Sequence, residues 1–556
     1  MDYLLHIFVM VSIYIILASS FNLLIGYAGL FALSHAAFFG VGAYATAILA
    51  GTYGLPFPLP LLIGILATAS LGMIIALPAL RIGGDYLVIV TLALQVIVTT
   101  VLINWTSLTG GTDGIRGIPR LELFGTVLNS PGKFLPLALV TAVICFAIAW
   151  RLGASPFGRA LKAMRENEAA VQAVGKNVVA MKLMVFAIAS ALAAVAGWLY
   201  AHYFTFVSAE GFTVELTIYM LAMVIIGGTG NLFGSLVGAI VLVALPEMLK
   251  FVDMPPDIAD KARNMLYGLL LIVMLRLRPQ GLLPESASAS SLHAPPERPP
   301  VATQAAGAAL EGKGLAKRFG GIVAVRDFDI SIPPGRITGL IGPNGAGKTT
   351  AFNLLTGFLQ PNEGEVTYRD RSLRGLKPHQ IVRTGVARSF QDLKLFTGMT
   401  VLENVLVALP NQRGDNLWYV YFMPWKVRAE ERENLGRAMS ILEFVGLGER
   451  AGDLASDLSY AEEKLLVVAR LLATGAEALL FDEPLSGLAP NALAKVMPVF
   501  RRLAESGRTL CIIEHNLDVI RELCSQVVFL DEGRKLAEGT PDELMHDPEL
   551  SERYFK

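Results

Sequence analysis

Nine residues in the second half of the chain have the types and spacing of a phosphate-binding loop: Gly342-Pro343-Asn344-Gly345-Ala346-Gly347-Lys348-Thr349-Thr350. They fit the P-loop pattern G-x-x-x-x-G-K-[ST] in full. Glycines let the backbone approach phosphate groups closely, and the N–H groups of a helix N-terminus attract anions. In this pattern Lys348 reaches the β- and γ-phosphates, and the Thr349 hydroxyl holds Mg²⁺.

The residues on either side predict the elements that position this loop. Ile337-Thr338-Gly339-Leu340-Ile341 is short and apolar, which is typical of a buried strand. Ala351-Phe352-Asn353-Leu354-Leu355 continues as the start of a helix. Both flanks therefore argue against a chance match in a glycine-rich loop. We expect the chain to bind a nucleotide between a strand end and a helix N-terminus.

Composition divides the chain into two parts of different character. It has 556 residues, of which 53% are hydrophobic, and its mean hydropathy is +0.53, too apolar for an ordinary soluble protein. Long uncharged runs fill the first half, whereas the second half has normal usage of charged residues. The net charge of −1 gives no sign of nucleic-acid binding, and the three cysteines have no metal-binding spacing. A membrane domain followed by a soluble domain is expected.

The first half predicts an all-α polytopic membrane domain with eight or nine spans, because a span needs about 20 apolar residues. We interpret the first apolar stretch as a span and not as a signal peptide, because it lacks a basic leader and further apolar segments follow. The spans are expected near residues 4–27, 31–51, 59–80, 86–106, 134–150, 182–207, 214–229, 233–250 and 263–277. Three of these, at 134–150, 214–229 and 263–277, are short, so one of them could be re-entrant or broken.

The distribution of Lys and Arg predicts the orientation of these spans. The stretch from Arg151 to Lys182 is rich in basic residues and should be cytoplasmic, so the loop from Ser107 to Lys133 faces outward. Within the basic stretch, residues 158–170 predict one short amphipathic helix that ends near Gly175. This helix is either a solvated loop between spans or a coupling helix that docks on a nucleotide-binding domain. We favour docking, because a P-loop domain follows on the same chain.

Few polar side chains fall inside the predicted spans. They are His35, Gln95, His202, Glu215 and Glu247. Ionisable groups within a membrane are candidates for function by default. Most of these lie near a predicted span end, however, so a structural role for each is favoured over a place in a substrate path.

The remaining boundaries follow from composition. Residues 284–309 are rich in Pro, Ala and Ser and predict a flexible linker. This places a transmembrane domain at residues 1–283 and an α/β P-loop ATPase domain at residues 310–556. A tether between two self-sufficient parts suggests a gene fusion.

Two adjacent carboxylates end an apolar strand in the soluble half. The sequence Leu479-Leu480-Phe481-Asp482-Glu483-Pro484 places Asp482 where it can hold Mg²⁺ through water and Glu483 where it can polarise an attacking water. Two acids at the end of a buried strand are costly unless they serve a cation. His515 follows the predicted strand from Thr509 to Ile513 and is placed to contact the γ-phosphate.

Three further residues lie in motifs of the soluble half. Phe319 precedes the P-loop and is placed to stack on an adenine, with a core phenylalanine as the alternative. Gln391 ends Ser389-Phe390-Gln391, and Ser459 belongs to Leu458-Ser459-Tyr460-Ala461-Glu462 ahead of a helix. The order of these motifs along the chain resembles the Walker A, Q-loop, signature, Walker B and switch-histidine order of an ABC transporter ATPase.

The closer resemblance is to the branched-chain amino acid uptake family of ABC transporters. Its ATP-binding subunit is similar over residues 341–350, 355–358, 388–391 and 513–515, and its permease subunit over residues 22–29, 34–40, 84–87 and 108–114. The resemblance thus spans both halves of the chain, which are usually separate chains in this family. It implies ATP and Mg²⁺ as cofactors, with Glu483, His515 and Gln391 as catalytic residues, Ser459 as a nucleotide contact, and Thr349, Gln391 and Asp482 as metal ligands.

For the whole protein the resemblance implies ATP-driven import of leucine, isoleucine and valine across a bacterial inner membrane, with the ATPase domain in the cytoplasm. It also implies a second permease subunit, a second ATPase subunit and an extracytoplasmic solute-binding protein as partners; a homodimer of this chain is the alternative. Import of a related solute such as an amide, urea or another small acid remains open. Export and a regulatory ATPase on a membrane anchor are disfavoured by the short loops and the intact ATPase motifs.

The signature motif departs from the Leu-Ser-Gly-Gly-Gln pattern of ABC proteins, and its fourth and fifth positions are Ala461 and Glu462. In the resemblance this motif faces the partner's nucleotide. A Cβ at Ala461 would crowd the γ-phosphate, and the charge of Glu462 would repel it. Ala489 also stands where many ABC proteins have Asp. One hypothesis is that the ATP site completed by this signature is the weaker of two; the other is that a family-specific signature works normally.

The first hypothesis predicts that Ala461→Gly with Glu462→Gln raises the ATPase rate of the assembled complex, because the crowding and the charge are both removed. Steady-state phosphate release from wild type and the double variant measures this. An unchanged rate would support the family-specific signature instead.

Overall fold

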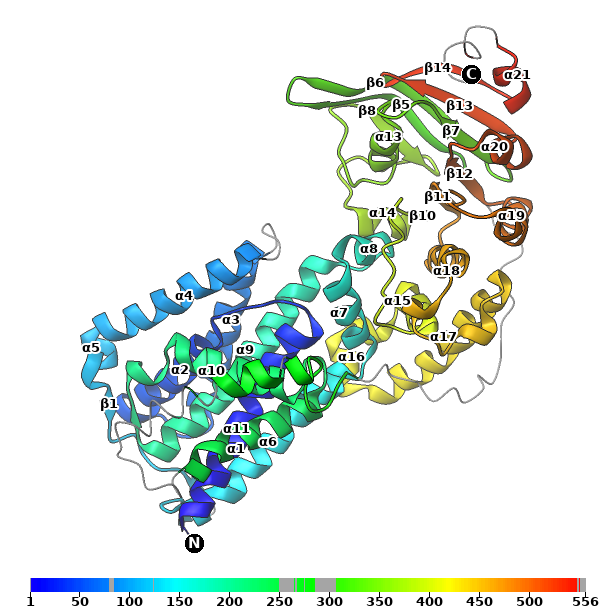
Figure 1. The fold of residues 1–556 in the computed structure, drawn as a ribbon. Helices are drawn as coiled ribbons and strands as arrows, with labels where there is room; N and C mark the ends of the chain where they lie inside the picture. The colour runs from blue at the N-terminus through cyan, green and yellow to red at the C-terminus, as the bar shows by residue number, and fades with distance from the viewer. Residues whose placement is uncertain are drawn as a thin grey trace. The chain divides into compact units, whose positions relative to one another are not determined.

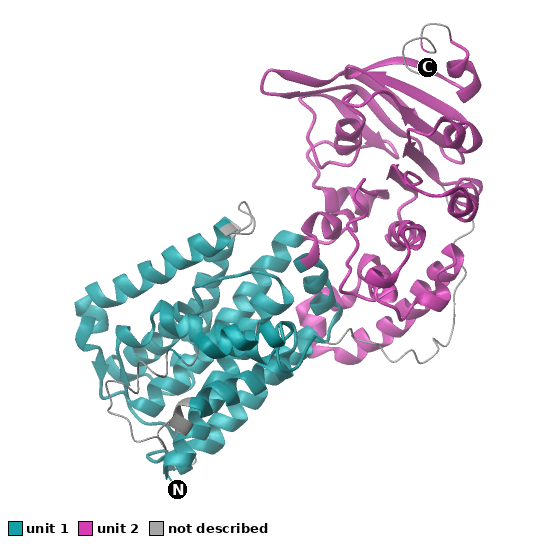
Figure 2. Ribbon diagram, in the orientation of Figure 1, with its two compact units in different colours: residues 1–165, 178–286 teal, residues 166–177, 287–556 magenta. Residues whose placement is uncertain are grey.

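The computed structural model describes residues 2–79, 85–123, 125–249, 265, 268–274, 276–285, 307–547 and 550. Contacts divide the chain into two compact units, shown in Figure 2. The first unit consists of Met1–Arg165 and Val178–Ser286, and the second of Glu166–Asn177 and Ala287–Lys556. The predicted boundaries at 283 and 310 stay predictions, and most of the predicted linker, residues 286–306, lies outside the described residues. The contacts add that residues 166–177, which lie within the first half of the sequence, pack as part of the second unit.

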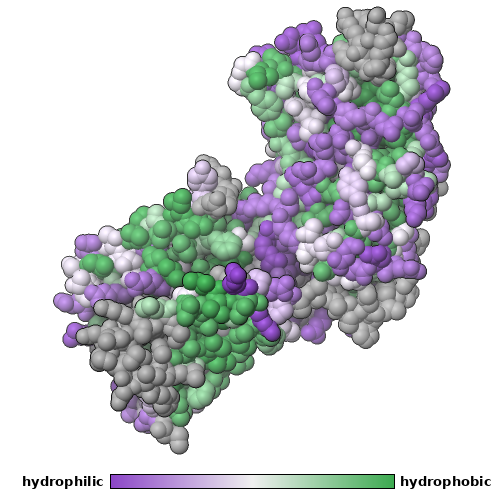
Figure 3. All heavy atoms as spheres, in the orientation of Figure 1, coloured by the Kyte–Doolittle hydropathy of each residue, from purple (hydrophilic) through white to green (hydrophobic). Residues whose placement is uncertain are grey.

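The first unit is built of long apolar helices, coloured from blue to green in Figure 1. Its longer helices are α1 (Asp2–Asn22), α2 (His35–Thr46), α3 (Leu59–Ala79), α4 (Asp85–Asn104), α6 (Pro131–Gly153), α7 (Pro156–Glu166), α9 (Val178–Phe204), α10 (Val214–Gly227) and α11 (Leu232–Leu249). Helix α1 continues in a π-helical turn at Leu23–Tyr27, and α2 continues in one at Ala47–Thr52. Figure 3 shows hydrophobic side chains gathered on the visible surface of this unit. An apolar exterior of this kind is expected of helices that face lipid.

Within the described part of the chain, seven helical stretches are long and apolar enough to cross a membrane. They are Asp2–Tyr27, His35–Thr52, Leu59–Pro78, Tyr86–Asn104, Pro131–Gly153, Val178–Phe204 and Ala209–Gly227. The apolar part of α11, Leu232–Leu245, is shorter. The predicted span at 134–150 is longer than expected, because its helix begins at Pro131, which suits a first helical position. The predicted ninth span, at 263–277, lies partly outside the described residues.

The helices of this unit approach one another through small residues. A Cβ built on Gly197 of α9 would lie 2.5 Å from both the backbone nitrogen of Ala43 and the carbonyl oxygen of Phe39 in α2. A Cβ on Gly42 would lie 2.5 Å from the Cα of Ala194. Glycine therefore sets the spacing of α2 and α9, as expected where helices pack in lipid through backbone contact.

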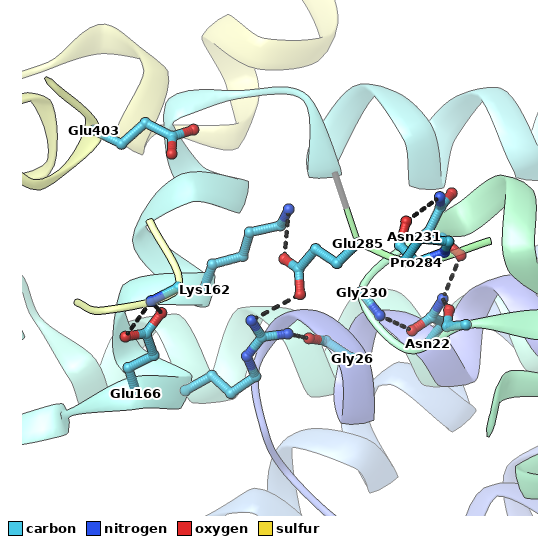
Figure 4. Close-up of polar contacts among 12 residues, drawn as sticks. Asn22, Gly26, Lys162, Glu166, Gly230, Asn231, Pro284, Glu285 and Glu403 are labelled. Atoms are coloured by element: carbon cyan, nitrogen blue, oxygen red, sulfur yellow. Dashed lines mark hydrogen bonds and ion pairs between the residues drawn. The ribbon is translucent and has the colours of Figure 1, made fainter. Parts of the chain in front are cut away.

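Polar side chains join the helix ends of the first unit in a cluster that Figure 4 shows. The Asn22 amide donates to the carbonyl of Asn231 at 2.9 Å and to the Ser235 hydroxyl at 2.6 Å, and its oxygen accepts from the Gly230 N–H at 3.0 Å. Glu285 lies 2.7 Å from Lys162. The same Glu285 carboxylate lies 2.9 Å from Arg165, whose guanidinium donates to the Gly26 carbonyl. The bonds to Asn231, Gly230 and Gly26 pair backbone groups near the helix ends.

The polar residues predicted within spans contact protein groups where they are described. The ring of His35 stacks on Phe21 and its Nε2 lies 2.9 Å from the Ser20 hydroxyl. The Gln95 amide accepts from the Ala37 N–H and donates to the Phe212 carbonyl, both at 2.7 Å. His202 Nδ1 lies 2.8 Å from the carbonyl of Pro119. Glu215 is exposed on α10, and the side chain of Glu247 lies outside the described ones. The described contacts of His35, Gln95 and His202 are therefore those of residues with a structural role.

The described residues of the second unit form two sheets. One is a six-stranded sheet in the order β10-β11-β12-β7-β13-β14, and the other is a four-stranded antiparallel sheet in the order β6-β5-β8-β9. The strands are β5 (Leu310–Phe319), β6 (Ile322–Ile332), β7 (Ile337–Ile341), β8 (Glu363–Tyr368), β9 (Arg371–Ser372), β10 (Val386–Arg388), β11 (Ala478–Asp482), β12 (Thr509–Ile513), β13 (Gln526–Asp531) and β14 (Arg534–Gly539). Strands β10, β11, β12, β7 and β13 run parallel, and β14 is antiparallel to β13. The predicted strands at 337–341 and 509–513 are confirmed.

Helices cover these sheets and form a separate helical layer (Figure 1). They are α8 (Glu168–Ala173), α13 (Lys348–Leu355), α14 (Pro378–Thr384), α15 (Val401–Ala408), α16 (Leu417–Phe422), α17 (Pro424–Val445), α18 (Tyr460–Ala473), α19 (Pro490–Glu505), α20 (Leu517–Leu523) and α21 (Pro541–Met545). Strands β7, β11 and β12 are buried along their whole length, which explains why they read as continuous apolar runs. Phe352 of α13 packs in the same core as Leu340, Leu480 and Ile513.

The close approach of α2 and α9 predicts the effect of one methyl group. Gly197→Ala should destabilise the membrane unit by roughly 1–3 kcal/mol, the usual cost of overpacking, because its Cβ would meet backbone atoms at 2.5 Å. Gly51→Ala is the matched control, since the nearest atoms to its Cβ lie at 3.9 Å. Thermal unfolding of the purified full chain in detergent measures both. Equal stability of the two variants would contradict this packing.

Candidate nucleotide site

Parallel strands bring the predicted site residues to one edge of the six-stranded sheet. The P-loop follows β7, Glu483 follows β11, and Glu514 and His515 follow β12. Register pairs Ile513 with both Leu340 and Asp482, so these three strands end at the same level. In a parallel sheet the carboxyl ends of the strands are where ligands bind. Gly342, Pro343, Asn344, Glu514 and His515 line one pocket there.

The P-loop backbone needs glycine at two positions. Gly342 has φ 150°, and a Cβ there would lie 1.9 Å from the carbonyl oxygen of Leu530. Gly347 has φ 99°, and its Cβ would lie 2.5 Å from the carbonyl oxygen of Ala324. Both sites therefore exclude other residues by conformation and by space. This fixes the path of the chain into α13, which begins at Lys348, three residues before the predicted helix start.

The loop residues themselves are arranged for an anion. The Lys348 ammonium donates to the carbonyls of Gly342 and Pro343, at 2.6 and 2.8 Å, and so curls over the loop. Burial lowers the pKa of Lys348 from its usual value, while the charges of Glu483 and Asp482 act in the opposite direction. Thr349 is exposed on the first turn of α13. A phosphate in the loop would give the ammonium a partner of opposite charge.

Asp482 is buried, and an arginine that the sequence motifs did not single out for this role is its partner. Arg388 Nη2 lies 3.2 Å from the Asp482 carboxylate, and both side chains are almost fully buried. The other arm of the guanidinium donates to the Asn353 amide oxygen at 2.5 Å. Burial lowers the pKa of Arg388 to about 10 and raises that of Asp482. The arginine therefore stays charged and compensates the buried carboxylate. Arg388 lies 94 residues before Asp482, so no local signal in the sequence pairs them.

Glu483 and His515 are in contact. His515 Nε2 lies 2.9 Å from a carboxylate oxygen of Glu483. Glu483 has φ 50°, a left-handed conformation that non-glycine residues rarely adopt. Such strain often marks a functional position. The structure thus brings together the two residues that the sequence predicts for the attacking water and the γ-phosphate.

Gln391 and Phe319 are among the predicted contacts that do not line this pocket. Gln391 is exposed beyond β10. Phe319 is 45% exposed at the end of β5, with Lys317 Nζ 5.6 Å from its ring, so it is not a core phenylalanine. Thr349, Gln391 and Asp482 supply hydroxyl, amide and carboxylate oxygens, the hard donors that suit Mg²⁺. The donor set therefore fits the predicted metal, although within the described residues no cluster of three or more His, Cys, Asp or Glu side chains could hold a metal ion.

The signature motif begins α18 through a capping box. The backbone N–H and the hydroxyl of Ser459 both donate to the Glu462 carboxylate, at 2.8 and 2.7 Å, and Arg450 lies 3.6 Å from it. The Ser459 hydrogen bonds lower the pKa of Glu462. Ser459 is therefore the N-cap of α18, and Glu462 is the N3 residue of the box. A nucleotide that takes the Ser459 hydroxyl as a donor must displace this bond.

Residues 166–177 form a second site, within the same unit. The predicted single helix over 158–170 is wrong: α7 ends at Glu166 and α8 begins at Glu168. The break lies at Asn167, which has an extended backbone and caps α8 by accepting the Ala170 N–H at 2.9 Å. A capping asparagine starts a new helix in this way.

The contacts of this segment support the predicted docking. The Glu166 carboxylate accepts the Gly398 N–H at 3.2 Å. Lys176 lies 2.6 Å from Asp415 and also donates to the Leu409 carbonyl at 3.3 Å. Gly175 has φ 85°, and a Cβ there would lie 3.3 Å from Val382 of α14. Both ends of the segment are therefore bonded to other parts of the second unit, around Gly398 at one end and around Leu409 and Asp415 at the other.

Comparison with known proteins agrees with both halves. Residues 3–275 match the family profile described as the branched-chain amino acid transport system / permease component, and residues 325–486 match that of the ABC transporter. The ATP-binding protein LivG of Escherichia coli K12 is 39% identical over 247 residues, which are 44% of this chain and 97% of LivG. The permease protein LivM of Salmonella typhimurium is 37% identical over 298 residues, 50% of this chain and 68% of LivM. An ATP-binding cassette solved in its ADP conformation, MJ1267, is 31% identical and covers 45% of this chain and 98% of its own, with a TM-score of 0.40.

The combined matches define an ABC transporter that carries a membrane domain and an ATPase domain on one chain. The chain belongs to the branched-chain amino acid transport family, in which its two halves match proteins named separately as permease and ATP-binding components.

Glu514 predicts a pH dependence of stability. Burial raises the pKa of this carboxyl to about 7, although it accepts the Leu485 N–H at 2.7 Å. A raised folded-state pKa means that folding favours the protonated form, so stability is lost as the pH rises from about 4.5 to about 7 and stays lower above that. Glu514→Gln keeps an acceptor without the charge. At pH 8 its free energy of unfolding should exceed that of wild type by about 1–3 kcal/mol, so its unfolding temperature should be higher. At pH 5 the variant and wild type should differ little in stability.

Thermal unfolding of the full chain at pH 5 and pH 8 measures this difference. Glu505→Gln, which replaces an exposed carboxylate at the end of α19, is the control and should follow wild type at both values. A Glu514→Gln variant that loses stability equally at both pH values would contradict the assignment.

Proposed function

We propose that this chain imports branched-chain amino acids, namely leucine, isoleucine and valine, across the bacterial inner membrane, with its ATPase unit in the cytoplasm. The observation that carries the proposal is the packing of residues 166–177 within the ATPase unit. These residues lie between α7 and α9, so a segment of the membrane half takes part in the fold of the ATPase half. The substrate class is supported by the relatives LivG and LivM, which are named as branched-chain amino acid transport proteins.

The chemistry follows from the groups at the sheet edge. The P-loop and Lys348 bind the phosphates of ATP. Glu483 polarises the attacking water, and His515 helps the Glu483 carboxylate to orient this water. Thr349, Gln391 and Asp482 would hold Mg²⁺, which neutralises phosphate charge when bound. Phe319 stacks on the adenine, and Ser459 contacts nucleotide at the paired domain. Hydrolysis coupled to movement of the permease makes the protein a translocase.

A complete transport path needs two membrane domains and two ATPase domains. We expect a second permease subunit, a second ATPase subunit and an external solute-binding protein as partners. Import of an amide, urea or another small acid is the alternative substrate class, and export is less favoured.

The test is uptake of labelled leucine into cells that express this chain with its neighbouring genes. Lys348→Ala should abolish uptake, because the loop then lacks its phosphate-binding ammonium, and Lys426→Ala is the matched control because Lys426 is exposed on α17. Unlabelled valine should compete with leucine, whereas urea and short amides should not.

The outcomes separate the parts of the proposal. Uptake that depends on Lys348 and is blocked by valine supports the branched-chain substrate. Uptake blocked by amides or urea instead would replace the substrate and keep the importer. Leucine efflux that depends on Lys348 would overturn import.

A further inference from the structure

Lys464 is a buried lysine beside Glu483, and the sequence motifs do not include it. It lies on the second turn of α18 and is only 4% exposed. Its ammonium donates to the carbonyl oxygen of Glu483 at 2.8 Å and lies 5.2 Å from the centre of the Tyr460 ring. A lysine is rarely buried unless its charge is paired or hydrogen-bonded. Here the described partners are a backbone carbonyl and an aromatic face.

The backbone group that Lys464 contacts belongs to a strained residue. Glu483 has φ 50°, a backbone conformation that is strained for a non-glycine residue. Its N–H donates to the Ile513 carbonyl at 3.0 Å, and its carbonyl accepts from Lys464. Both backbone polar groups of Glu483 are thus bonded to other elements, β12 on one side and α18 on the other. These two bonds hold the conformation from which the Glu483 carboxylate reaches His515.

The residues that follow Glu483 are held by the same two elements. The Leu485 N–H donates to the Glu514 carboxylate at 2.7 Å, directly after β12. The Tyr460 hydroxyl, on α18, donates to the Ser486 carbonyl at 3.4 Å. Lys464 is the charged donor of this set, whereas the Leu485 N–H and the Tyr460 hydroxyl are neutral donors, and it acts on the residue that carries the catalytic carboxylate. A charged donor makes a hydrogen bond roughly twice as strong as a neutral one.

We propose that Lys464 is a positioning residue for ATP hydrolysis: its ammonium fixes the carbonyl of Glu483 and thereby keeps the Glu483 carboxylate at the place where it polarises water. This rests on the proposed role of Glu483. Lys464 bonds to the backbone of Glu483 and not to the carboxylate, so it changes the geometry of the carboxylate without taking part in the proton transfer. Ser459 caps α18 and Lys464 lies on its second turn, so movement of the signature motif would be transmitted to Glu483 by the same bond.

The test uses the full chain assembled with its partner subunits in lipid nanodiscs. Lys464→Met keeps the length of the side chain and removes the donor, Lys464→Arg keeps a charged donor, and Lys426→Met is the exposed control. Turnover number and KM for ATP are measured by phosphate release, and ATP affinity is measured by binding. Lys464→Met should lower turnover about tenfold or more and leave ATP affinity within about twofold, and Lys464→Arg should recover part of the loss.

A double-mutant comparison separates positioning from simple stabilisation. If Lys464 acts through the Glu483 carboxylate, Lys464→Met should cause little further loss in a Glu483→Gln background, measured as single-turnover hydrolysis. A loss of the same size in both backgrounds, or turnover of Lys464→Met within twofold of wild type, would overturn the proposal. Should Lys464→Met not assemble, Lys464→Gln is measured in the same two backgrounds and judged by the same two criteria. Wild-type protein without Lys348-dependent ATPase activity would instead overturn the proposed function itself.

Discussion

The parallel register of β11, β12 and β7 is the constraint on which the nucleotide site depends. Because Asp482, Ile513 and Leu340 lie level in the sheet, the loops that follow them start from one edge. These loops carry the glycines of the P-loop, Glu483 and His515. If one of these strands ran antiparallel to the others, its loop would start from the opposite edge. The close approach of the P-loop to β13 adds a second constraint, since at Gly342 a Cβ would lie 1.9 Å from the carbonyl of Leu530.

The same edge concentrates charge that burial would otherwise make costly. Asp482 and Glu483 are adjacent acids, and the positive groups around them come from separate elements: Arg388 from β10, Lys348 from the P-loop helix and Lys464 from α18. Each cation has a different partner, namely the Asp482 carboxylate, the P-loop carbonyls and the Glu483 carbonyl. A buried carboxylate is tolerated when such partners are present. These cations therefore offset the negative charge of the two acids beside the P-loop, where the phosphates would bind.

Much of this arrangement could be predicted from the sequence, because its signals are local. The P-loop, the strand before it and the acidic strand end are contiguous runs of residues, and β7 and β12 appear where the apolar runs place them. Arg388 and Lys464 could not be assigned their roles, because their partners lie 94 and 19 residues away and the pairing depends on the fold. The helix break at Asn167 was also missed. Asparagine fits both an exposed helix position and a cap, and only the extended backbone at residue 167 decides between them.

The segment 166–177 gives the fusion of the two halves a physical meaning beyond a shared chain. Its two ends are peptide bonds to α7 and to the residue that begins α9, so any displacement of the segment moves the ends of these helices. Its own contacts, however, are to α14 and to the loops that hold Gly398 and Asp415, within the ATPase unit. Packed contacts transmit displacement, so movement of these ATPase elements would move the segment that they hold. The same contacts would persist if the two halves were separate chains, as the separately named LivG and LivM relatives are.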